Sequence, residues 1–155
     1  MLEEQIADIY GPFVTIEFGA MIVLLVWAVM NIVAGGIFFV QKKQYFWQMI
    51  VMWNIVNLVI ALFSLFRINQ LPDMGEQEVL RHTIFSMLIV AGNIGLNIAY
   101  FVTAFALDEI GKIREGERLQ GYAKAIFVQA AFLLIFDVVL LILLYNQFNS
   151  SLIGG

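Results

Sequence analysis

The sequence contains no cysteine, a single histidine and few charged residues. Of its 155 residues only 13% are charged, and the one histidine is His82. The absence of cysteine excludes disulfides and thiolate nucleophiles. With only one histidine available, a zinc site built from histidine and cysteine is excluded as well. We therefore expect neither a metal nor another cofactor.

The sequence also lacks the short motifs of common catalytic sites. It has no G-x-S-x-G, no H-E-x-x-H and no dinucleotide-binding fingerprint. Gly111 and Gly116 have the spacing of a phosphate-binding loop, but Glu117 follows where that loop requires lysine. The basic loops are too short to bind nucleic acid and suit anionic lipid headgroups instead. We predict a protein that is not an enzyme and has no nucleic-acid partner.

Hydrophobic residues, in contrast, are abundant. They make up 62% of the chain, and the mean hydropathy is +0.91. A soluble domain of this size needs far more polar surface, so most of the chain is expected to face lipid. The apolar runs are long enough to cross a bilayer as helices. The predicted fold is all-α, an integral membrane four-helix bundle in a single domain, with spans over residues 13–40, 45–66, 83–107 and 121–145.

The two ends of the chain differ from the spans in composition. Residues 1–12 read as a short amphipathic helix lying in the membrane interface, which Gly11-Pro12 would end, or alternatively as a frayed tail. Residues 146–155 are polar and are predicted to form a mobile tail. A cleavable signal peptide is not expected, because the first basic residue is Lys42.

The distribution of lysine and arginine predicts an orientation. Loops 41–44 and 108–120 contain most of the basic residues, whereas the opposite side has only Arg67 and Arg81. Cytoplasmic loops of membrane proteins are enriched in lysine and arginine. Both loops are therefore predicted to be cytoplasmic, with the N- and C-termini outside.

Each predicted span has one stripe of polar residues on an otherwise apolar helix, which is typical of a bundle with a polar interior and a lipid-facing exterior. A rise of about 1.5 Å per residue places these side chains in three layers. The first layer holds Asn57, Asn93 and Asp137, the second Asn54 and Asn97, and the third Asn31 and Gln129, while Glu17 lies near the end of its span.

Asp137 is the one acid predicted deep in the membrane, where a carboxylate costs at least about 2.5–3.5 kcal/mol. We expect it to be protonated, or hydrogen-bonded to Asn57 and Asn93. The polar residues form a candidate binding or proton site. The alternative is interhelical hydrogen bonding, which contributes roughly 0.6–2 kcal/mol per bond. For Glu17 the alternative is a side chain that reaches the headgroups, and His82 is expected to be an interfacial or capping residue.

The third span also has a face of small residues roughly opposite its asparagines. Small residues let membrane helices approach closely, so this helix is expected to be the least lipid-exposed, either central in the bundle or at a dimer interface. The residues predicted to pack helices in this way are Gly92, Gly95, Ala99, Gly35 and Gly36.

Three segments together carry a resemblance to a known family: Trp53–Leu58, Asn93–Tyr100 and Gln129–Asp137. They resemble an uncharacterised family of small bacterial four-span membrane proteins, over the last three spans. The resemblance implies the four-span fold and the inner membrane of a bacterium, but no activity. That family often has aspartate where this chain has Asn97, which implies a less charged interior here.

Two classes of function fit these observations. The first is a structural or accessory subunit that binds partner helices or membrane lipids, as a homo-oligomer or within a larger complex. The second is a small proton-linked transporter or channel that works through Asp137 and the asparagine layers. The sequence favours the first slightly.

Overall fold

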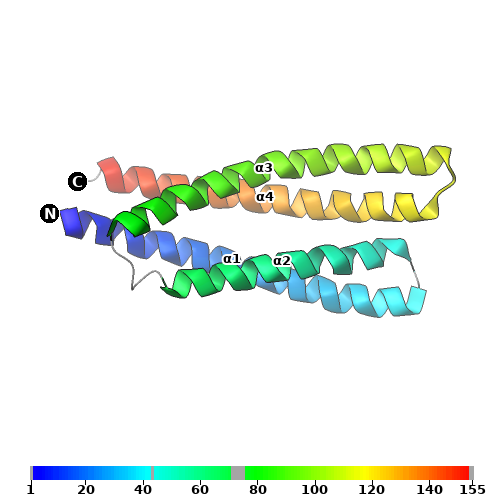
Figure 1. The fold of residues 1–155 in the computed structure, drawn as a ribbon, viewed down its shortest axis with the longest axis horizontal. Coiled ribbons are helices and arrows are strands. Elements are labelled where there is room, and N and C mark those ends of the chain that lie inside the picture. The colour runs from blue at the N-terminus through cyan, green and yellow to red at the C-terminus, as the bar shows by residue number, and fades with distance from the viewer. Residues whose placement is uncertain (1, 43, 71–75, 154–155) are drawn as a thin grey trace.

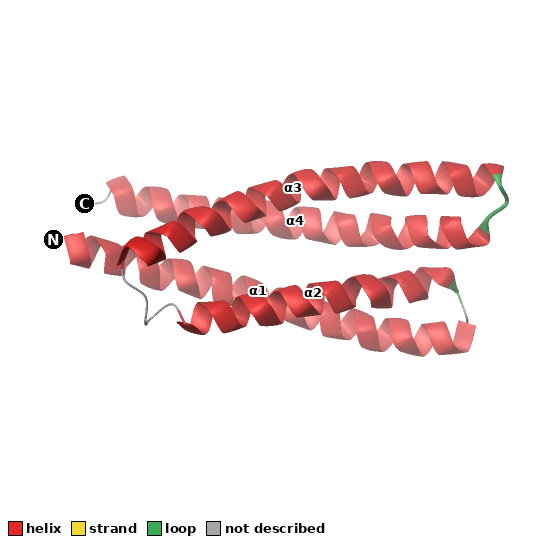
Figure 2. Cartoon of the chain, viewed as in Figure 1, coloured by secondary structure: helices red, strands yellow, loops and turns green. Residues whose placement is uncertain are grey.

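The computed structural model describes residues 2–42, 44–70 and 76–153, and these segments form four long helices (Figures 1 and 2). Over the part of the chain described there is no strand. Each helix includes a stretch long and apolar enough to cross a membrane. The all-α, four-span membrane fold is therefore confirmed. The helices are α1 (Leu2–Lys42), α2 (Tyr45–Gln70), α3 (Glu76–Ile113) and α4 (Glu117–Ile153).

The helices form two antiparallel hairpins that lie side by side. α1 packs along α2, and α3 packs along α4 (Figure 1). Both hairpin turns lie at one end of the molecule, which we call the turn end, and both chain termini lie at the other, the terminal end. α4 holds the two hairpins together, because in the other hairpin it packs most extensively on α2 and also on α1, whereas α2 and α3 barely touch each other.

α1 continues through Pro12, so the prediction of a separate helix ended by Gly11-Pro12 is wrong. Proline removes one backbone donor from a helix, and in membrane helices hydroxyl side chains help to satisfy the backbone nearby. Here the Thr15 hydroxyl donates over 2.9 Å to the Gly11 carbonyl, which is an additional bond beside the proline and not a replacement for the donor that Pro12 lacks. Residues 2–12 are thus the first turns of a 41-residue helix.

The other helices also extend beyond their predicted spans. α4 reaches Ile153, so the prediction of a tail from residue 146 is wrong for residues 146–153. The predicted loop 108–120 is reduced to residues 114–116, where Glu115 has a φ of 51° and the Gly116 amide donates to the Gly111 carbonyl. Hydropathy marks the membrane-embedded part of a helix, but its backbone hydrogen bonds continue into the polar flanks. The turn predicted at residues 71–73 lies outside the described residues.

Two glycines allow close helix contacts near the turn end. A Cβ atom on Gly35 of α1 would lie 2.9 Å from the Val51 side chain of α2. A Cβ atom on Gly121 of α4 would lie 3.0 Å from the Phe46 backbone nitrogen of α2. Because real Cβ contacts are rarely so short, glycine at these two positions lets α2 approach both α1 and α4.

The small-residue face of α3 does not pack within the chain. A Cβ atom on Gly92 or Gly95 would have no neighbour within 4 Å, and Ala99 is exposed. Gly36 of α1 is likewise open. In the most apolar stretch of each helix, 11% of the residues are buried in α3 and 28% in α4. The expectation that the third helix would be the least lipid-exposed is therefore wrong for the single chain, because α4 occupies the centre.

The terminal half has its own apolar core, formed by three of the four helices. Phe13 of α1 packs with Val90 of α3 and with Leu140 and Leu144 of α4. α2 contributes no residue to this cluster. As a consequence, α2 stands apart from α3 over the terminal half of the bundle.

Candidate functional site

A cavity of about 590 Å³ separates α2 from α3 in the terminal half. We call it the cleft. Its two walls come from α2 and α3, and its floor comes from α1 and α4. The wall side chains at its rim are large, apolar and exposed, so the cleft opens sideways toward lipid. These rim residues are Val56, Ile60 and Phe63 of α2 and Phe85, Ile89 and Leu96 of α3.

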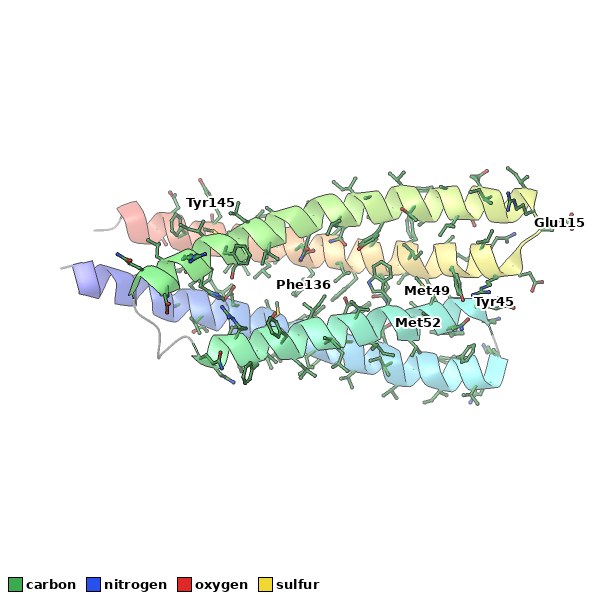
Figure 3. All side chains as sticks on the ribbon, in the orientation of Figure 1. Tyr45, Met49, Met52, Glu115, Phe136 and Tyr145 are labelled. Carbon is green, nitrogen blue, oxygen red and sulfur yellow. The ribbon has the colours of Figure 1, made fainter. Side chains whose placement is uncertain are left out.

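An aromatic contact closes the cleft toward the turn end. Trp53 of α2 and Tyr100 of α3 meet edge to face, with ring centroids 4.8 Å apart. Phe136 of α4 lies between the two hairpins and also lines the cavity (Figure 3). Because α2 and α3 have little other contact, the cleft is closed at mid-helix and opens toward the terminal end.

Asp137 lies on the floor of the cleft and is bonded to α3. Its Oδ2 atom accepts a hydrogen bond of 2.7 Å from Nδ2 of Asn97. Both side chains are buried, with 5% and 2% of their surfaces exposed. The prediction that Asp137 is hydrogen-bonded to Asn57 and Asn93 is therefore wrong. Asn97 lies one turn nearer the turn end than Asn93 on the same helix face, so the error in depth is about 6 Å.

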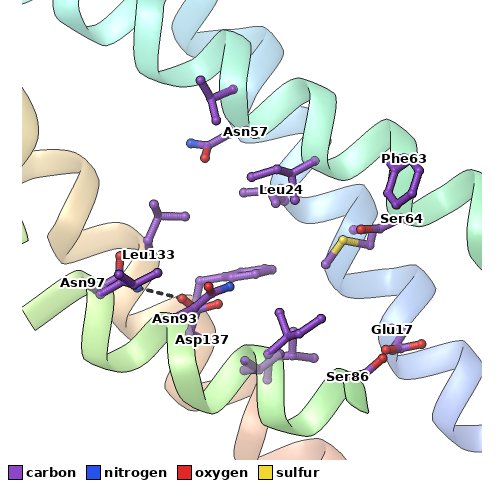
Figure 4. A pocket seen from close by; sticks show the side chains of 18 of the residues that line it. Glu17, Leu24, Asn57, Phe63, Ser64, Ser86, Asn93, Asn97, Leu133 and Asp137 are labelled. Carbon is purple, nitrogen blue, oxygen red and sulfur yellow. Dashed lines mark hydrogen bonds between the residues drawn. The ribbon is translucent and has the colours of Figure 1, made fainter. Parts of the chain in front are cut away.

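Asn57 and Asn93 face the cleft from opposite walls, as Figure 4 shows. On α2, the Asn57 amide donates over 3.5 Å to Oδ1 of Asn54, whose own amide donates to the Ile50 carbonyl. Asn93 is half-buried and makes no hydrogen bond with any residue that the structure describes. The Asn93 amide therefore remains available to a molecule in the cleft.

Glu17 and His82 form a second polar pair nearer the terminal end. Oε2 of Glu17 on α1 lies 3.0 Å from Nε2 of His82 on α3, and the Ser86 hydroxyl lies 3.4 Å from the same nitrogen. Glu17 is 8% exposed, so the alternative in which it reaches the headgroups is wrong. This pairing was not predicted from the sequence. The available signal was that both residues lie near the same end of two spans running in the same direction.

Asn31 and Gln129 lie away from the cleft, in the turn half. Asn31 donates to the backbone carbonyl of Trp27 within α1. The Trp27 indole donates over 3.2 Å to Oε1 of Gln129, and its ring stacks on Phe132 at a centroid distance of 3.8 Å. The predicted third layer is therefore organised by Trp27, and it joins α1 to α4 rather than forming a site.

Five of the predicted site residues line the cleft, together with further residues that were not predicted to belong to a site. Asn54 lies just behind the cleft. Within the described segments no three acidic or histidine side chains come together in a way that could hold a metal ion. The predicted residues that line the cleft are Glu17, Asn57, Asn93, Asn97 and Asp137, and the added polar and aromatic ones are Trp53, Ser64, Arg67, His82, Ser86, Tyr100 and Phe136.

The arrangement combines apolar walls with a few polar groups on the floor. In a medium of low dielectric constant a hydrogen bond is stronger than in water, and an unpaired polar group is costly. The Asn57 and Asn93 amides and the Asp137 carboxyl can therefore hold the polar part of an otherwise apolar molecule. Asp137 is also chemically able to take up and release a proton.

Comparison with protein families shows to which family the chain belongs. Residues 23–138 match the model of DUF6992, a family of unknown function. The match covers most of the chain and all of the residues that line the cleft except Glu17, Met21 and Leu140, and the chain belongs to this family. The resemblance inferred for the last three spans thus extends into the first. No match was found among curated proteins or among solved structures.

Proposed function

We propose that this protein is a non-enzymatic accessory protein of the bacterial inner membrane, which binds an amphipathic partner, a lipid or a partner helix, in the cleft. One observation carries the proposal: a cavity of about 590 Å³ opens to lipid through apolar rims yet has polar side chains on its floor. Ligand sites typically have volumes of about 300–1,000 Å³ and combine mostly apolar linings with a few placed polar groups.

The unused polar group on the α3 wall of the cleft, Asn93, supports binding rather than simple helix packing. A polar residue that serves only helix packing is bonded either to a neighbouring helix or, like Asn31 and Asn54, to a carbonyl of its own helix. Asn97 and Asp137 are bonded in this way, whereas Asn93 offers its amide to the cavity. A partner that supplies a hydrogen-bonding group there removes an unpaired polar group from hydrocarbon, which is favourable.

The proposal includes an orientation. We place the turn end in the cytoplasm, because Lys42, Lys112, Arg114, Arg118 and Lys124 lie at or near it and few basic residues lie at the terminal end. The cleft then opens in the outer half of the membrane. A partner helix could additionally use the open face of α3 at Gly92, Gly95 and Ala99, making a homo-oligomer or a larger complex.

Photocrosslinking from two neighbouring positions tests the binding proposal. A photoreactive phenylalanine analogue replaces Phe85, which lines the cleft, or Ile84, which is also exposed but does not line it. After irradiation in native membranes, mass spectrometry identifies what is attached. We expect a defined partner at position 85 and only bulk lipid at position 84. Identical bulk-lipid products at both positions would contradict the proposal.

Proton-linked transport is the second candidate, and one observation favours it. Asp137 and the Glu17–His82 pair both line the same cleft, so two titratable clusters share one space. Flux assays in proteoliposomes test it with Asp137→Asn, using Glu109→Gln on the exposed surface as the matched control. A pH-dependent flux that only Asp137→Asn abolishes would establish transport. The binding proposal expects no flux from any of the three proteins.

A further inference from the structure

We infer that the molecule held in the cleft is a neutral lipid, whose uncharged, hydrogen-bonding head lies at the level of Asn93 and Asp137. This inference rests on the proposed function and names the class of its ligand. It depends on three properties of the cleft: the charges along its length, the hydrogen-bonding groups on its floor, and its size.

The charges along the cleft disfavour an anionic headgroup at depth. At the closed end the polar lining side chains are Asp137, the asparagines, Trp53 and Tyr100, and none of them is basic. Among the described lining residues, the basic ones are Arg67 and His82. They stand ten or eleven residues along their helices from Asn57 and Asn93, which corresponds to about 15 Å. A phosphate at the closed end would face a carboxyl group with no cation within reach.

The hydrogen-bonding groups suit a hydroxyl or a carbonyl. An asparagine amide offers both donors and an acceptor, and Asn93 has no partner within the described chain. Asn57 faces it from α2, and among the described residues its side chain makes one hydrogen bond, the long one of 3.5 Å to Asn54. A head with an uncharged hydroxyl or ester group can bond to both walls without bringing a charge into hydrocarbon.

The size of the cleft favours one lipid over a partner helix. Its volume of about 590 Å³ is that of a site for a small molecule. A helix with its side chains is about 10 Å across, so a helix that ran the full length of α2 and α3 between them would have to break the Trp53–Tyr100 contact. A lipid head fits on the terminal side of that contact. Its acyl chains can extend into the membrane between the exposed rim residues Phe63 and Phe85.

The test compares two lipids that differ only in their heads. The full-length protein is placed in nanodiscs that contain a trace of photoactivatable diacylglycerol, or of phosphatidylglycerol with the same photoreactive chain. Labelled peptides from α2 and α3 are then quantified by mass spectrometry. We expect diacylglycerol to label cleft residues at least about fivefold more than phosphatidylglycerol, because the charged phosphate of phosphatidylglycerol would lose water at the closed end without gaining a cation.

Two variants and one competition experiment complete the test. Asn93→Leu should reduce diacylglycerol labelling of the cleft about fivefold. Asn31→Leu, whose amide bonds to its own helix away from the cleft, should leave it unchanged. Excess unlabelled diacylglycerol should displace the photoactivatable lipid from the wild-type protein. This competition experiment does not depend on whether a variant folds.

The outcomes separate the inference from the proposed function. Equal cleft labelling by both lipids, or label that excess diacylglycerol does not displace, would overturn the neutral-lipid inference and leave cleft binding intact. A crosslink from position 85 to a polypeptide would likewise overturn this inference while supporting the proposed function. Labelling spread evenly over all lipid-facing surfaces, together with bulk lipid alone at position 85, would overturn both.

Discussion

The two halves of this bundle are built from the same four helices and pack differently. In the turn half, α2 lies against α1 at Gly35 and against α4 at Gly121, and Trp27 stacks on Phe132. In the terminal half, α1, α3 and α4 share an apolar core from which α2 is absent. The turn half is therefore closed, and the terminal half contains the cleft.

Polar side chains behave differently in the two halves. In the turn half, Oε1 of Gln129 accepts a bond from Trp27 and Asn31 bonds to its own helix, so both join or satisfy neighbouring groups, although the buried Nε2 atom of Gln129 has no partner among the described residues. In the terminal half, Asn93 faces a cavity, and within the described segments Asp137 is bonded to Asn97 alone. The comparison shows that a polar residue in a membrane helix takes its role from how closely the helices around it approach. The same amide can join helices where they touch and can bind a ligand where they diverge.

The strongest test of the closed half is Trp27→Ala. This change removes the stack on Phe132 and the bond to Gln129. We expect the free energy of unfolding, measured by detergent titration, to fall by about 3 kcal/mol, near the lower end for tryptophan-to-alanine changes because the side chain is partly exposed. Trp27→Phe keeps a ring and should lose about 1 kcal/mol. If Trp27→Ala lost less than Trp27→Phe, the closed half would not depend on this contact.

Gly121→Val tests the close approach of α4 to α2. The new side chain would meet the Phe46 backbone nitrogen and the Tyr45 Cβ atom at 3.0 Å. Since backbone atoms cannot rotate away, we expect the free energy of unfolding to fall by about 1–3 kcal/mol. Gly95→Val is the matched control, because its Cβ would meet nothing within 4 Å, and it should change stability by less than about 0.5 kcal/mol. A larger loss at Gly95 would instead show that the α3 face is packed against another chain.

Asn97→Leu tests the one hydrogen bond that joins α3 to Asp137. The change leaves the buried carboxyl without its partner, so we expect a loss of about 1–2 kcal/mol in the free energy of unfolding. The double variant Asn97→Leu, Asp137→Leu should recover part of that loss, because it removes the unpaired group as well. Equal losses in the single and double variants would show that the bond does not hold the cleft floor together.

The sequence was sufficient to predict the helices and their polar faces, because hydropathy and the 3.6-residue period depend only on residue type and spacing. It could not give the helix ends, since polar flanks at residues 146–153 remain helical after the apolar signal stops. It also could not choose between Asn93 and Asn97 as the partner of Asp137. These two asparagines share a face, and only the relative shift of α3 along α4 distinguishes them.

The cleft itself could not be predicted either. The cleft exists because α2 diverges from α3. No residue pattern in either helix predicts this divergence. Glu17 and His82 show the same limit, because their pairing requires α1 and α3 to approach at the terminal end. The residues of the candidate site were therefore visible in the sequence, whereas the space between them was not.

The smallest effect is expected at the rim of the cleft, and it decides whether the terminal half is open in a membrane. Phe63 is 66% exposed, and in a bilayer lipid replaces whatever contacts an exposed side chain loses. Phe63→Ala should therefore change the free energy of unfolding by less than about 0.5 kcal/mol. Leu144→Ala, at a fully buried position in the terminal core, should cost about 2–4 kcal/mol in the same assay. A loss at Phe63 that approached the loss at Leu144 would mean that α2 and α3 close on each other in the membrane, and the contrast between the two halves would not hold there.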